Sequence, residues 1–369
     1  MNDPAPVSPA DCHFRVASAA DAPAVNQLFA EYLGSLGLTP DAELDADLVD
    51  FPAAYTAPGD TFLVATGPDG QLRGMGGIRR GELRRVFVRA AQRGRGLARA
   101  LVLRLLQAAI ATGQTQFHGV IARSNAAIRE VDLACGLLPT GRAPAHPKQR
   151  DCEILAVTRP PDLSRPVMVL IGGTPENWRA LLSQFAPQFI PNSEVGVGRS
   201  PTPWGAHPPS GAVFRALAEN RRRTQARGDS TTSVRAPELD ARAHPATPEG
   251  GCAPPTSAFG FNVLFAWHES EAATADLVRE QAAAGRWVGA IRFNLARPER
   301  LPFFAEVAQT LAGPCRALLV LPGAETLLPA LRLAFAPQLA AHPAARILRV
   351  TDPIRPAELT ALLSAAAAR

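Results

Sequence analysis

Apolar residues in the first 160 positions alternate between strand-like and helix-like spacing. A period of two predicts a hairpin over 61–80, joined at Pro68-Asp69-Gly70, and strands over 14–17, 82–88, 117–122 and 152–158. Apolar residues three and four positions apart predict helices over 18–37, 96–112 and 125–135, the first capped by Ser18 or Asp21. We therefore expect residues 14–158 to form one mixed α/β unit.

From residue 167 the pattern becomes a regular alternation of short apolar runs and amphipathic helices. The expected strands lie near 167–171, 261–267, 287–293, 316–321 and 346–351. The expected helices lie at 175–186, 269–284, 299–312, 325–340 and 356–368. Such alternation is typical of a parallel sheet with helices on both faces, so we predict a five-stranded, three-layer open sheet like those of flavodoxin or receiver folds.

A segment near 190–256, rich in Pro, Gly, Arg and Ser, interrupts this second half. We interpret it as a long insertion with one helix over 210–226, because structureless connections of this length are uncommon inside compact domains. The sequence therefore predicts an α/β protein of two domains, residues 1–160 and residues 161–369, with the insertion in the second.

The composition is that of a globular chain. The 369 residues suggest two or three domains, and 47% hydrophobic with 19% charged residues excludes a disordered protein. A net charge of +5 suits a polyanionic cofactor as well as a nucleic acid. The basic run "ENRRRTQARGD" has no interleaved aromatic residues and no groove-reading motif, so we do not expect nucleic-acid binding.

The sequence also indicates a compartment. No apolar run reaches the roughly 18 residues of a membrane span, and the first residues do not resemble a signal peptide. The five cysteines are widely spaced without a CxxC motif, which favours reduced thiols and no metal site. We expect a cytoplasmic protein without a membrane partner. A homodimer is compatible with the sequence.

A glycine-rich stretch, "QRGRGLA", lies between the strand over 82–88 and the next helix. Gly94 and Gly96 let the backbone approach a ligand closely, while Arg93 and Arg95 add positive charge. A helix N-terminus leaves backbone N–H groups unpaired, so a phosphate or pyrophosphate is the expected guest. The stretch is neither a Walker loop nor GxGxxG, since position 99 is Arg. The alternative is a turn that only caps the helix.

The longer stretch "ELRRVFVRAAQRGRGLARALVLRLL" strongly resembles the acetyl-CoA site of the GNAT superfamily of N-acetyltransferases. Arg93, Gly96 and Ala98 match the family pattern Arg/Gln-x-x-Gly-x-Gly/Ala, and the resemblance, to one bacterial branch, covers roughly residues 12–160. It implies a GNAT-like mixed sheet that binds acetyl-CoA. The residues implied in cofactor binding are the pyrophosphate-holding backbone of Arg93, Gly94, Arg95, Gly96, Leu97 and Ala98, the pantetheine-contacting Phe87 and Val88, and Asn125.

The family's catalytic residues are less well matched in this sequence than its cofactor-binding residues. "NAAIREVDLACGLL" stands where the family has N-x-x-A-x-x-L-Y-x-x-x-G-F, and only Asn125 and Gly136 match. The family's acidic Tyr is replaced by Asp132, which is normally ionised at neutral pH and a poor proton donor. The alternatives are proton donation by solvent, donation by one of Cys135, His118 and His13, or a domain with little activity.

Glu82 begins the strand before the glycine-rich stretch, where relatives often carry a carboxylate. It could deprotonate an amine through water, or it could be an exposed strand-end carboxylate. We expect an N-acetyltransferase that passes acetyl from acetyl-CoA directly to an amine of a small molecule or peptide. The alternative is an acyl-CoA sensor whose second domain carries the regulatory output.

The second half resembles no family that we can name. The predicted strand ends carry Gly172-Gly173, Asn294 and Asp352 where a phosphoacceptor receiver needs acidic residues and a lysine, so a phosphorelay is excluded. His268-Glu269 is the most chemically suggestive pair at these ends, although a single His after a strand is usually a packing or capping residue.

Overall fold

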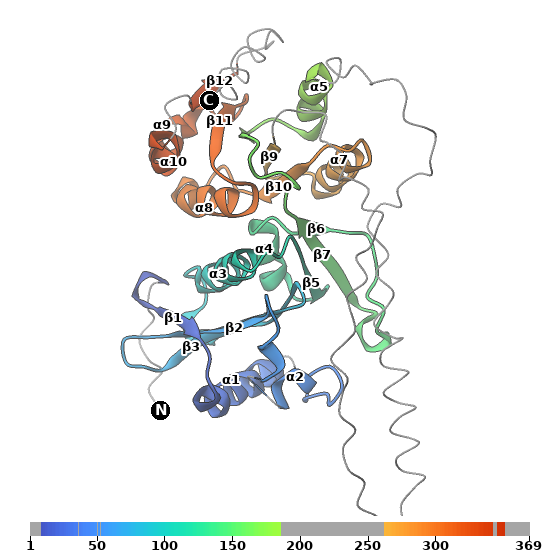
Figure 1. Cartoon of the computed structure of the whole chain (residues 1–369), viewed down its shortest axis with the longest axis vertical. Coiled ribbons are helices and arrows are strands. Elements are labelled where there is room, and N and C mark those ends of the chain that lie inside the picture. Colours follow the sequence, from blue (N-terminus) through green and yellow to red (C-terminus); the bar gives the residue numbers. More distant parts are fainter. Residues whose placement is uncertain are drawn as a thin grey trace, which may run out of the picture. The chain divides into compact units, whose positions relative to one another are not determined.

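The computed structural model of the chain describes residues 9–185, apart from 36, 50 and 52, together with 262–341 and 345–350. These residues form a seven-stranded sheet from the first half and a five-stranded sheet from the second (Figure 1). The mixed α/β class is confirmed. The insertion near 190–256, the helix expected over 356–368 and Asp352 lie outside the described residues.

The first sheet has the strand order β1-β2-β3-β4-β5-β7-β6. Neighbouring strands run antiparallel except β4 and β5, which are parallel. The strands are β1 (His13–Val16), β2 (Thr61–Thr66), β3 (Leu72–Arg79), β4 (Glu82–Val88), β5 (Gln116–Ala122), β6 (Leu138–Pro139) and β7 (Cys152–Thr158). The predicted strands are all present, and only the two-residue β6 was not predicted.

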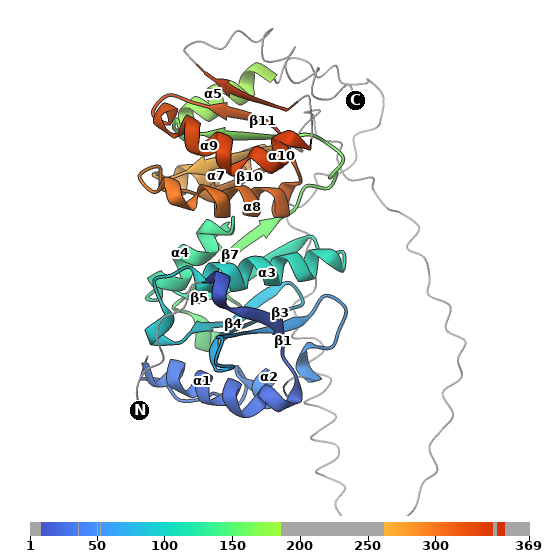
Figure 2. The ribbon, with the colours of Figure 1, turned by 90° about the vertical axis from the view of Figure 1, so that its left-hand side faces the viewer.

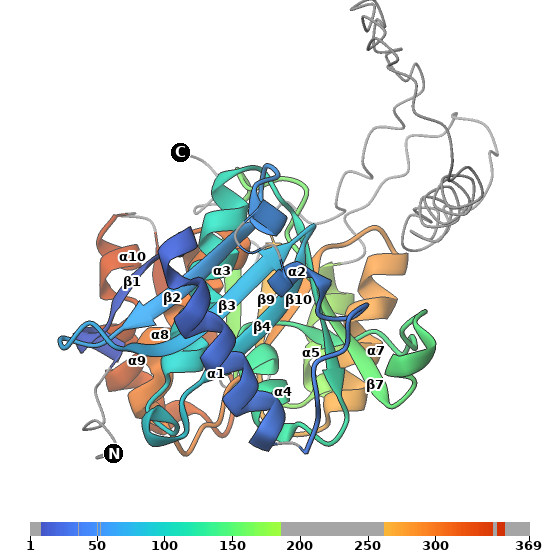
Figure 3. The same cartoon turned by 90° about the horizontal axis from the view of Figure 1, so that it is seen from below.

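Helices cover both faces of this sheet. On one face α1 (Ala22–Ser35) packs against β3 and β4, and the short α2 (Ala46–Val49) lies on the same side. On the other face α3 (Leu97–Ala111) packs against β2, β3 and β4, with α4 (Ala126–Ala134) beside it (Figure 2). Figure 3 shows α1 crossing the strands obliquely. The helices pack against the sheet because their apolar residues recur at helical spacing, which gives each helix one apolar face to bury.

The second sheet is wholly parallel, with the order β10-β9-β8-β11-β12. Its strands are β8 (Val167–Ile171), β9 (Asn262–Trp267), β10 (Val288–Arg292), β11 (Cys315–Val320) and β12 (Arg346–Arg349). One face carries α5 (Pro175–Phe185) and α7 (Glu271–Ala283), and the other carries α8 (Leu301–Ala312), α9 (Leu328–Ala334) and α10 (Ala336–Ala340) (Figure 1). Burial of both faces explains the nearly continuous apolar strands.

Two details of this half differ from the expectation. In chain order the strands lie third, second, first, fourth and fifth, which is the order of dinucleotide-binding sheets and not the order of flavodoxin or receiver folds. The helix predicted over 325–340 is divided into α9 and α10, because Pro337 lacks the N–H that a continuous helix needs. None of the described helices is long and apolar enough to cross a membrane.

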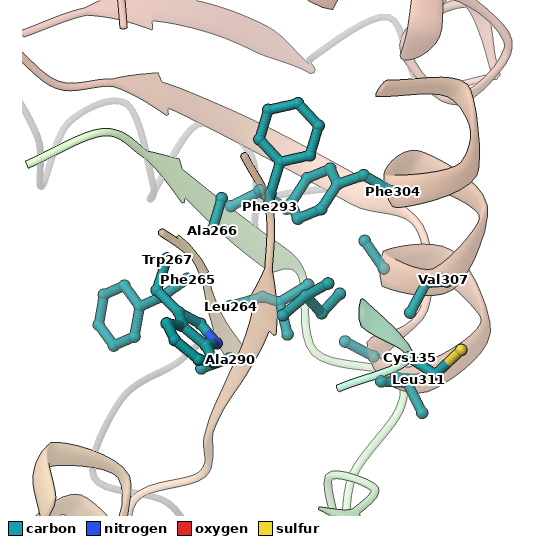
Figure 4. Close-up of a cluster of buried hydrophobic side chains, with 14 of the residues drawn as sticks. Cys135, Leu264, Phe265, Ala266, Trp267, Ala290, Phe293, Phe304, Val307 and Leu311 are labelled. Atoms are coloured by element: carbon teal, nitrogen blue, oxygen red, sulfur yellow. The ribbon is translucent and has the colours of Figure 1, made fainter. Parts of the chain in front are cut away.

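The two sheets belong to one compact unit and share one buried apolar cluster. Gly136, which follows α4, lies at one of the contacts between the halves: a Cβ there would lie 2.5 Å from Leu311 Cδ1 on α8. Its φ of +88° also lies in the left-handed region that favours glycine. Figure 4 shows the neighbouring Cys135 beside Leu311 within this cluster. Gly136 therefore has a packing role as well as a turn role.

Gly136→Ala should lower the free energy of unfolding by about 2–3 kcal/mol, because left-handed strain adds to overpacking against a buried leucine. The measurement is urea unfolding of the full chain. Gly113→Ala is the matched control: its φ is +91°, and a Cβ there meets nothing within 4 Å. Equal losses in the two variants would show that the contact with Leu311 contributes nothing.

Candidate active site

The central feature of the first sheet is a fork between two parallel strands. β4 and β5 pair only at Glu82↔His118 and Leu83↔Gly119, and no further pairing joins them. A bulge in β4 accompanies the separation, because Arg85 and Val86 together stand opposite Gly76 of β3. Arg85 has a φ of 57°, which is uncommon for a residue with a side chain. The β5-facing edge of β4 is therefore left open to a ligand beyond the fork.

A cavity of about 210 Å³ lies at the fork, and we call it the fork cavity. It is bounded by both strands, by α1 and by α4. The polar and ionisable residues that line it and concern the chemistry are Tyr32, Asp45, Glu82, Arg85, Asn125 and Asp132. The structure thus brings the two predicted catalytic carboxyl groups, Glu82 and Asp132, to one cavity although they are 50 positions apart in sequence.

Glu82 is the first residue of β4 and lines the open part of the cavity. Its side chain is 29% exposed, and its Oε1 lies 3.4 Å from Nε of Arg84. On the adjacent strand it pairs with His118, whose pKa is lowered by burial and raised to a smaller extent by the Glu82 carboxylate. Water can therefore reach Glu82, as a base that acts through water requires.

Asp132 has a different environment. It is only 2% exposed on α4, and its Oδ1 has no hydrogen-bond partner among the described residues. A Cβ on Gly119 would lie 2.8 Å from Oδ2, so glycine at the fork makes room for this carboxyl group. Burial raises the pKa of Asp132 to about 8. The expectation that Asp132 is ionised at neutral pH is therefore wrong, because desolvation favours the protonated acid.

Asn125 serves first as a helix cap. Its Oδ1 accepts a hydrogen bond from the Ile128 N–H at 3.4 Å at the start of α4. Its Nδ2 donates to the Tyr32 hydroxyl at 3.5 Å, and Asn125 lines the fork cavity. We predicted Asn125 as a cofactor contact, and its capping role competes with that assignment for one of its two polar atoms.

Tyr32 reaches the cavity from α1; it is one of only two tyrosines in the sequence, and from the sequence it is not an obvious replacement for the family's tyrosine. Its ring lies 5.0 Å from that of Phe87, and burial raises the pKa of its hydroxyl. The hydroxyl therefore stays protonated at neutral pH and is a second potential donor in the cavity. The helical spacing predicted Tyr32 on an apolar face, but only the packing of α1 against the forked strands directs it to the site.

An ionic cluster, also missed from the sequence, forms one wall of the cavity. The Arg85 guanidinium contacts Asp45 at 2.7 Å and Asp47 at 2.5 Å and donates to the Leu44 carbonyl at 2.6 Å. Burial opposes ionisation of Asp47, but Arg85 and Arg84 more than offset it and lower its pKa. In the sequence, the acidic run "DAELDADL" and the "RR" within a strand were the features that could have predicted this cluster. The cluster fastens the segment before α2 onto β4.

The predicted pyrophosphate cradle lies at the N-terminus of α3. Gly96 is the N-cap residue with a φ of 89°, and no side chain caps the helix. A Cβ at Gly94 would meet nothing within 4 Å, and one at Gly96 would meet only Pro9 Cγ at 3.9 Å. Arg95 is exposed, Ala98 is half-buried and Leu97 is buried, so the loop presents backbone and positive charge while Leu97 anchors it. This geometry fits a phosphate group.

Phe87 and Val88 end β4 beyond the fork. The Phe87 side chain is buried toward α1, and Val88 is buried in the cluster that includes α3. Arg93 Nε donates to the Val88 carbonyl at 3.0 Å, and its guanidinium lies 5.2 Å from the Phe87 ring. The Val88 carbonyl is thus already engaged, which leaves the remaining backbone groups of this edge for an extended ligand. Arg93 links the cradle to the strand.

None of the other three donors considered from the sequence lines the fork cavity. Cys135 is buried, and burial raises the pKa of its thiol well above the usual value. His118 on β5 is half-buried and is not among the residues that line the cavity, and His13 is exposed on β1. Within the described residues no group of three His, Cys, Asp or Glu side chains is arranged to hold a metal ion.

The forked parallel strand pair beside the uncapped N-terminus of α3 is the arrangement that the sequence resemblance implies, and the family comparison agrees. Residues 24–130 match the family model described as Acetyltransferase (GNAT) family. Residues 24–130 therefore carry a GNAT acetyltransferase domain, which confirms the resemblance seen in the sequence. No family model matches the second half.

Comparison with solved structures returns GNAT enzymes over the same half. A GNAT acetyltransferase from Staphylococcus aureus is 12% identical, with 40% of this chain and 98% of that chain covered and a TM-score of 0.36. A phosphinothricin acetyltransferase from Sinorhizobium meliloti, in complex with acetyl-CoA, is 20% identical (40% and 88% covered, TM-score 0.32). A spermidine N-acetyltransferase chimera from Vibrio cholerae is 14% identical (40% and 95% covered, TM-score 0.33). Comparison with curated proteins finds no match.

Proposed function

We propose that the first domain transfers acetyl from acetyl-CoA directly to a primary amine of a small molecule or peptide. Acetyl-CoA supplies the activated thioester, and the backbone of residues 93–98 holds its pyrophosphate. The open edge of β4 receives the pantetheine arm, which directs the thioester toward the fork cavity. The uncapped N-terminus of α3 and the unpaired edge of β4 support this assignment.

Two of the proton transfers that accompany the reaction are each served by a carboxyl group. Glu82 accepts the proton of the incoming amine through water, so that the neutral nitrogen attacks the thioester carbon. As the carbon–sulfur bond breaks, Asp132 donates its proton to the departing thiolate, and the nitrogen of the new amide releases its second proton to water. Glu82 is then protonated and Asp132 ionised, and exchange with solvent restores both. The products are the acetylated amine and free CoA.

The observation that carries this proposal is the contrast between the two carboxyl groups of one cavity. Asp132 is buried with a pKa raised to about 8, whereas Glu82 is partly exposed. Pairs of carboxyl groups in contrasting environments are how enzymes obtain an acid and a base from the same side-chain chemistry. A buried, protonated Asp132 also weakens the reading of the domain as an inactive sensor.

The test is CoA release from acetyl-CoA by the purified full-length chain, with a panel of amines, amino acids and peptides. Release that depends on one class of amine would establish the activity and identify the acceptor. Binding of acetyl-CoA, measured by thermal shift, without release for any member of the panel would favour the sensor and refute catalysis by Asp132.

Glu82→Gln should lower kcat/KM at pH 7 by about a hundredfold, because the amine loses its base. The affinity for acetyl-CoA should stay within about twofold, since the cradle is untouched. The difference in kcat/KM between the variant and the unaltered enzyme should narrow as the pH approaches the pKa of the amine. More of the amine is then already neutral, so the base is no longer needed. Steady-state rates from pH 6.5 to 9.5 provide the check. A gap that does not change with pH would mean that Glu82 acts only structurally.

A further inference from the structure

A second cavity, of about 100 Å³, lies on the other side of α3 from the sheet, and the proposed transfer does not use it. Its walls come from the first turn of α3, from α4, and from the carboxyl ends of β9 and β10 with the start of α8. The ionisable residues that line it are Arg99, Glu130, His268, Arg292 and Arg300. We call it the arginine cavity. Three guanidinium groups thus face one carboxylate.

The single carboxylate, that of Glu130, is paired with Arg292. Its Nη1 donates to Glu130 Oε1, and its guanidinium lies 5.4 Å from the Trp267 ring. Arg99 and Arg300 form no ion pair within the described residues. Burial lowers the pKa of Arg99, and the nearby Arg300 charge lowers it further, while Glu130 opposes this more weakly. The cavity therefore holds two like charges close together without a neutralising partner of their own.

Buried polar atoms in the cavity also lack partners. Arg99 Nε, a donor, and His268 Nδ1, which donates in one of the two neutral tautomers, are inaccessible to solvent and have no hydrogen-bond partner in the described part of the chain. A buried donor without an acceptor is destabilising, because it loses its hydrogen bonds to water without replacing them. The first turn of α8, which begins at Leu301, adds the positive end of a helix dipole at the same wall. The positive charge, the unpaired polar atoms and the helix dipole all favour the binding of an anion with several acceptor oxygens.

From this convergence we propose that the arginine cavity binds a phosphate group, held by Arg99, Arg300 and His268. A phosphate offers several acceptor oxygens, and guanidinium groups bind it with paired, charge-assisted hydrogen bonds. The position agrees with a general property of open parallel sheets, whose ligands lie beyond the carboxyl ends of the strands. The second half of the chain thereby supplies two of the three proposed phosphate-binding residues, His268 and Arg300.

The phosphate can come from two sources. Arg99 follows Gly96 by three residues on α3, about 4.5 Å along the helix axis, so the nucleotide end of a bound CoA is one source. This first arm rests on the proposed function. A separate phosphate-bearing small molecule is the other source, and it would act as an effector through α3, whose N-terminus forms the cradle.

The experiment measures binding by isothermal titration calorimetry with the full-length chain. Inorganic phosphate is titrated first, without CoA, and then CoA and 3′-dephospho-CoA are compared. Arg300→Gln should weaken phosphate binding by about tenfold, because one charge-assisted contact is lost. Arg99→Gln provides a second variant. Arg297→Gln is the matched control, since Arg297 is exposed, pairs with Glu299 and does not line the cavity.

The two sources give different results, and each supports the site. If CoA carries the phosphate, CoA binds more tightly than 3′-dephospho-CoA, and the difference disappears in Arg300→Gln. If a separate ligand carries it, the two forms of CoA bind alike and inorganic phosphate binds beside them. The proposal is overturned if no probe responds to Arg300→Gln or Arg99→Gln more than to Arg297→Gln. Failure of both forms of CoA to bind would refute only the proposed acetyl transfer, because inorganic phosphate tests the cavity independently.

Discussion

Asp132→Asn should slow acetyl transfer by about a hundredfold or more in kcat, because the thiolate loses its proton donor. Asp132 lines the fork cavity with an unpaired Oδ1, so it is placed to protonate a thiolate formed there. In the unaltered enzyme kcat should fall as the pH rises through about 8, where Asp132 ionises. The variant should lose this descending limb. The measurement is kcat at saturating acetyl-CoA and amine from pH 6.5 to 9.5.

Asp151→Asn is the control for this variant, because it makes the same Asp-to-Asn change at an exposed position that lines neither cavity. A comparable loss in both variants, or an unchanged pH profile in Asp132→Asn, would assign proton donation to Tyr32 or to solvent instead.

The same variant should change the dependence of stability on pH. The pKa of Asp132 is raised in the folded chain to about 8, from its ordinary value near 4, so between these values only the folded state keeps the proton. Stability should therefore fall as the pH rises through this window, by up to about 1.4 kcal/mol per pH unit from this one group. Asp132→Asn should remove that slope, as urea unfolding at a series of pH values would reveal.

Gly96→Trp should abolish binding of CoA. The added side chain would occupy the open space in front of the uncapped α3 N-terminus. Gly96 has a φ of 89°, which tryptophan adopts only with strain, so the turn that presents the backbone amides would also be distorted. We expect the dissociation constant to rise by at least about a hundredfold, since the pyrophosphate contacts are charge-assisted and are lost together. Calorimetric titration with CoA provides the measurement.

Gly113→Trp makes a matched comparison at the opposite end of the same helix. Gly113 has a φ of +91° and nothing within 4 Å of an added Cβ, so the backbone strain is similar while the cradle is untouched. Its affinity for CoA should be that of the unaltered chain. If Gly96→Trp binds CoA as tightly as Gly113→Trp does, the cradle is not where the pyrophosphate lies.

The cradle and the overall class were predictable because their physical causes are local. Gly94 and Gly96 ahead of an apolar helix specify an open, positively charged helix N-terminus within one short stretch. Periods of two and of about 3.6 likewise predicted nearly every described element. Even the division of the helix over 325–340 follows from one local residue, Pro337, although its spacing alone suggested a single helix.

The catalytic environment was not predictable, because it depends on groups brought together from distant parts of the chain. The spacing within α4 located Asp132, but its protonation depends on desolvation by neighbours such as Gly119 of β5, and that reversed the expectation of an ionised acid. Tyr32 and the Asp45–Arg85 wall enter the cavity for the same reason. The order of the parallel strands is also a tertiary property, since any order satisfies the same alternation of strand and helix.

The amino-acid sequence alone thus determined the α/β class, the residues of the cradle and the likeness to an acetyl-CoA-dependent transferase, because each depends on neighbours along the chain. Only the tertiary structure decided which carboxyl group is buried and which is exposed, and that the second half supplies His268, Arg292 and Arg300 to a cavity beside α3. Burial and the convergence of like charges arise from contacts between segments far apart in sequence.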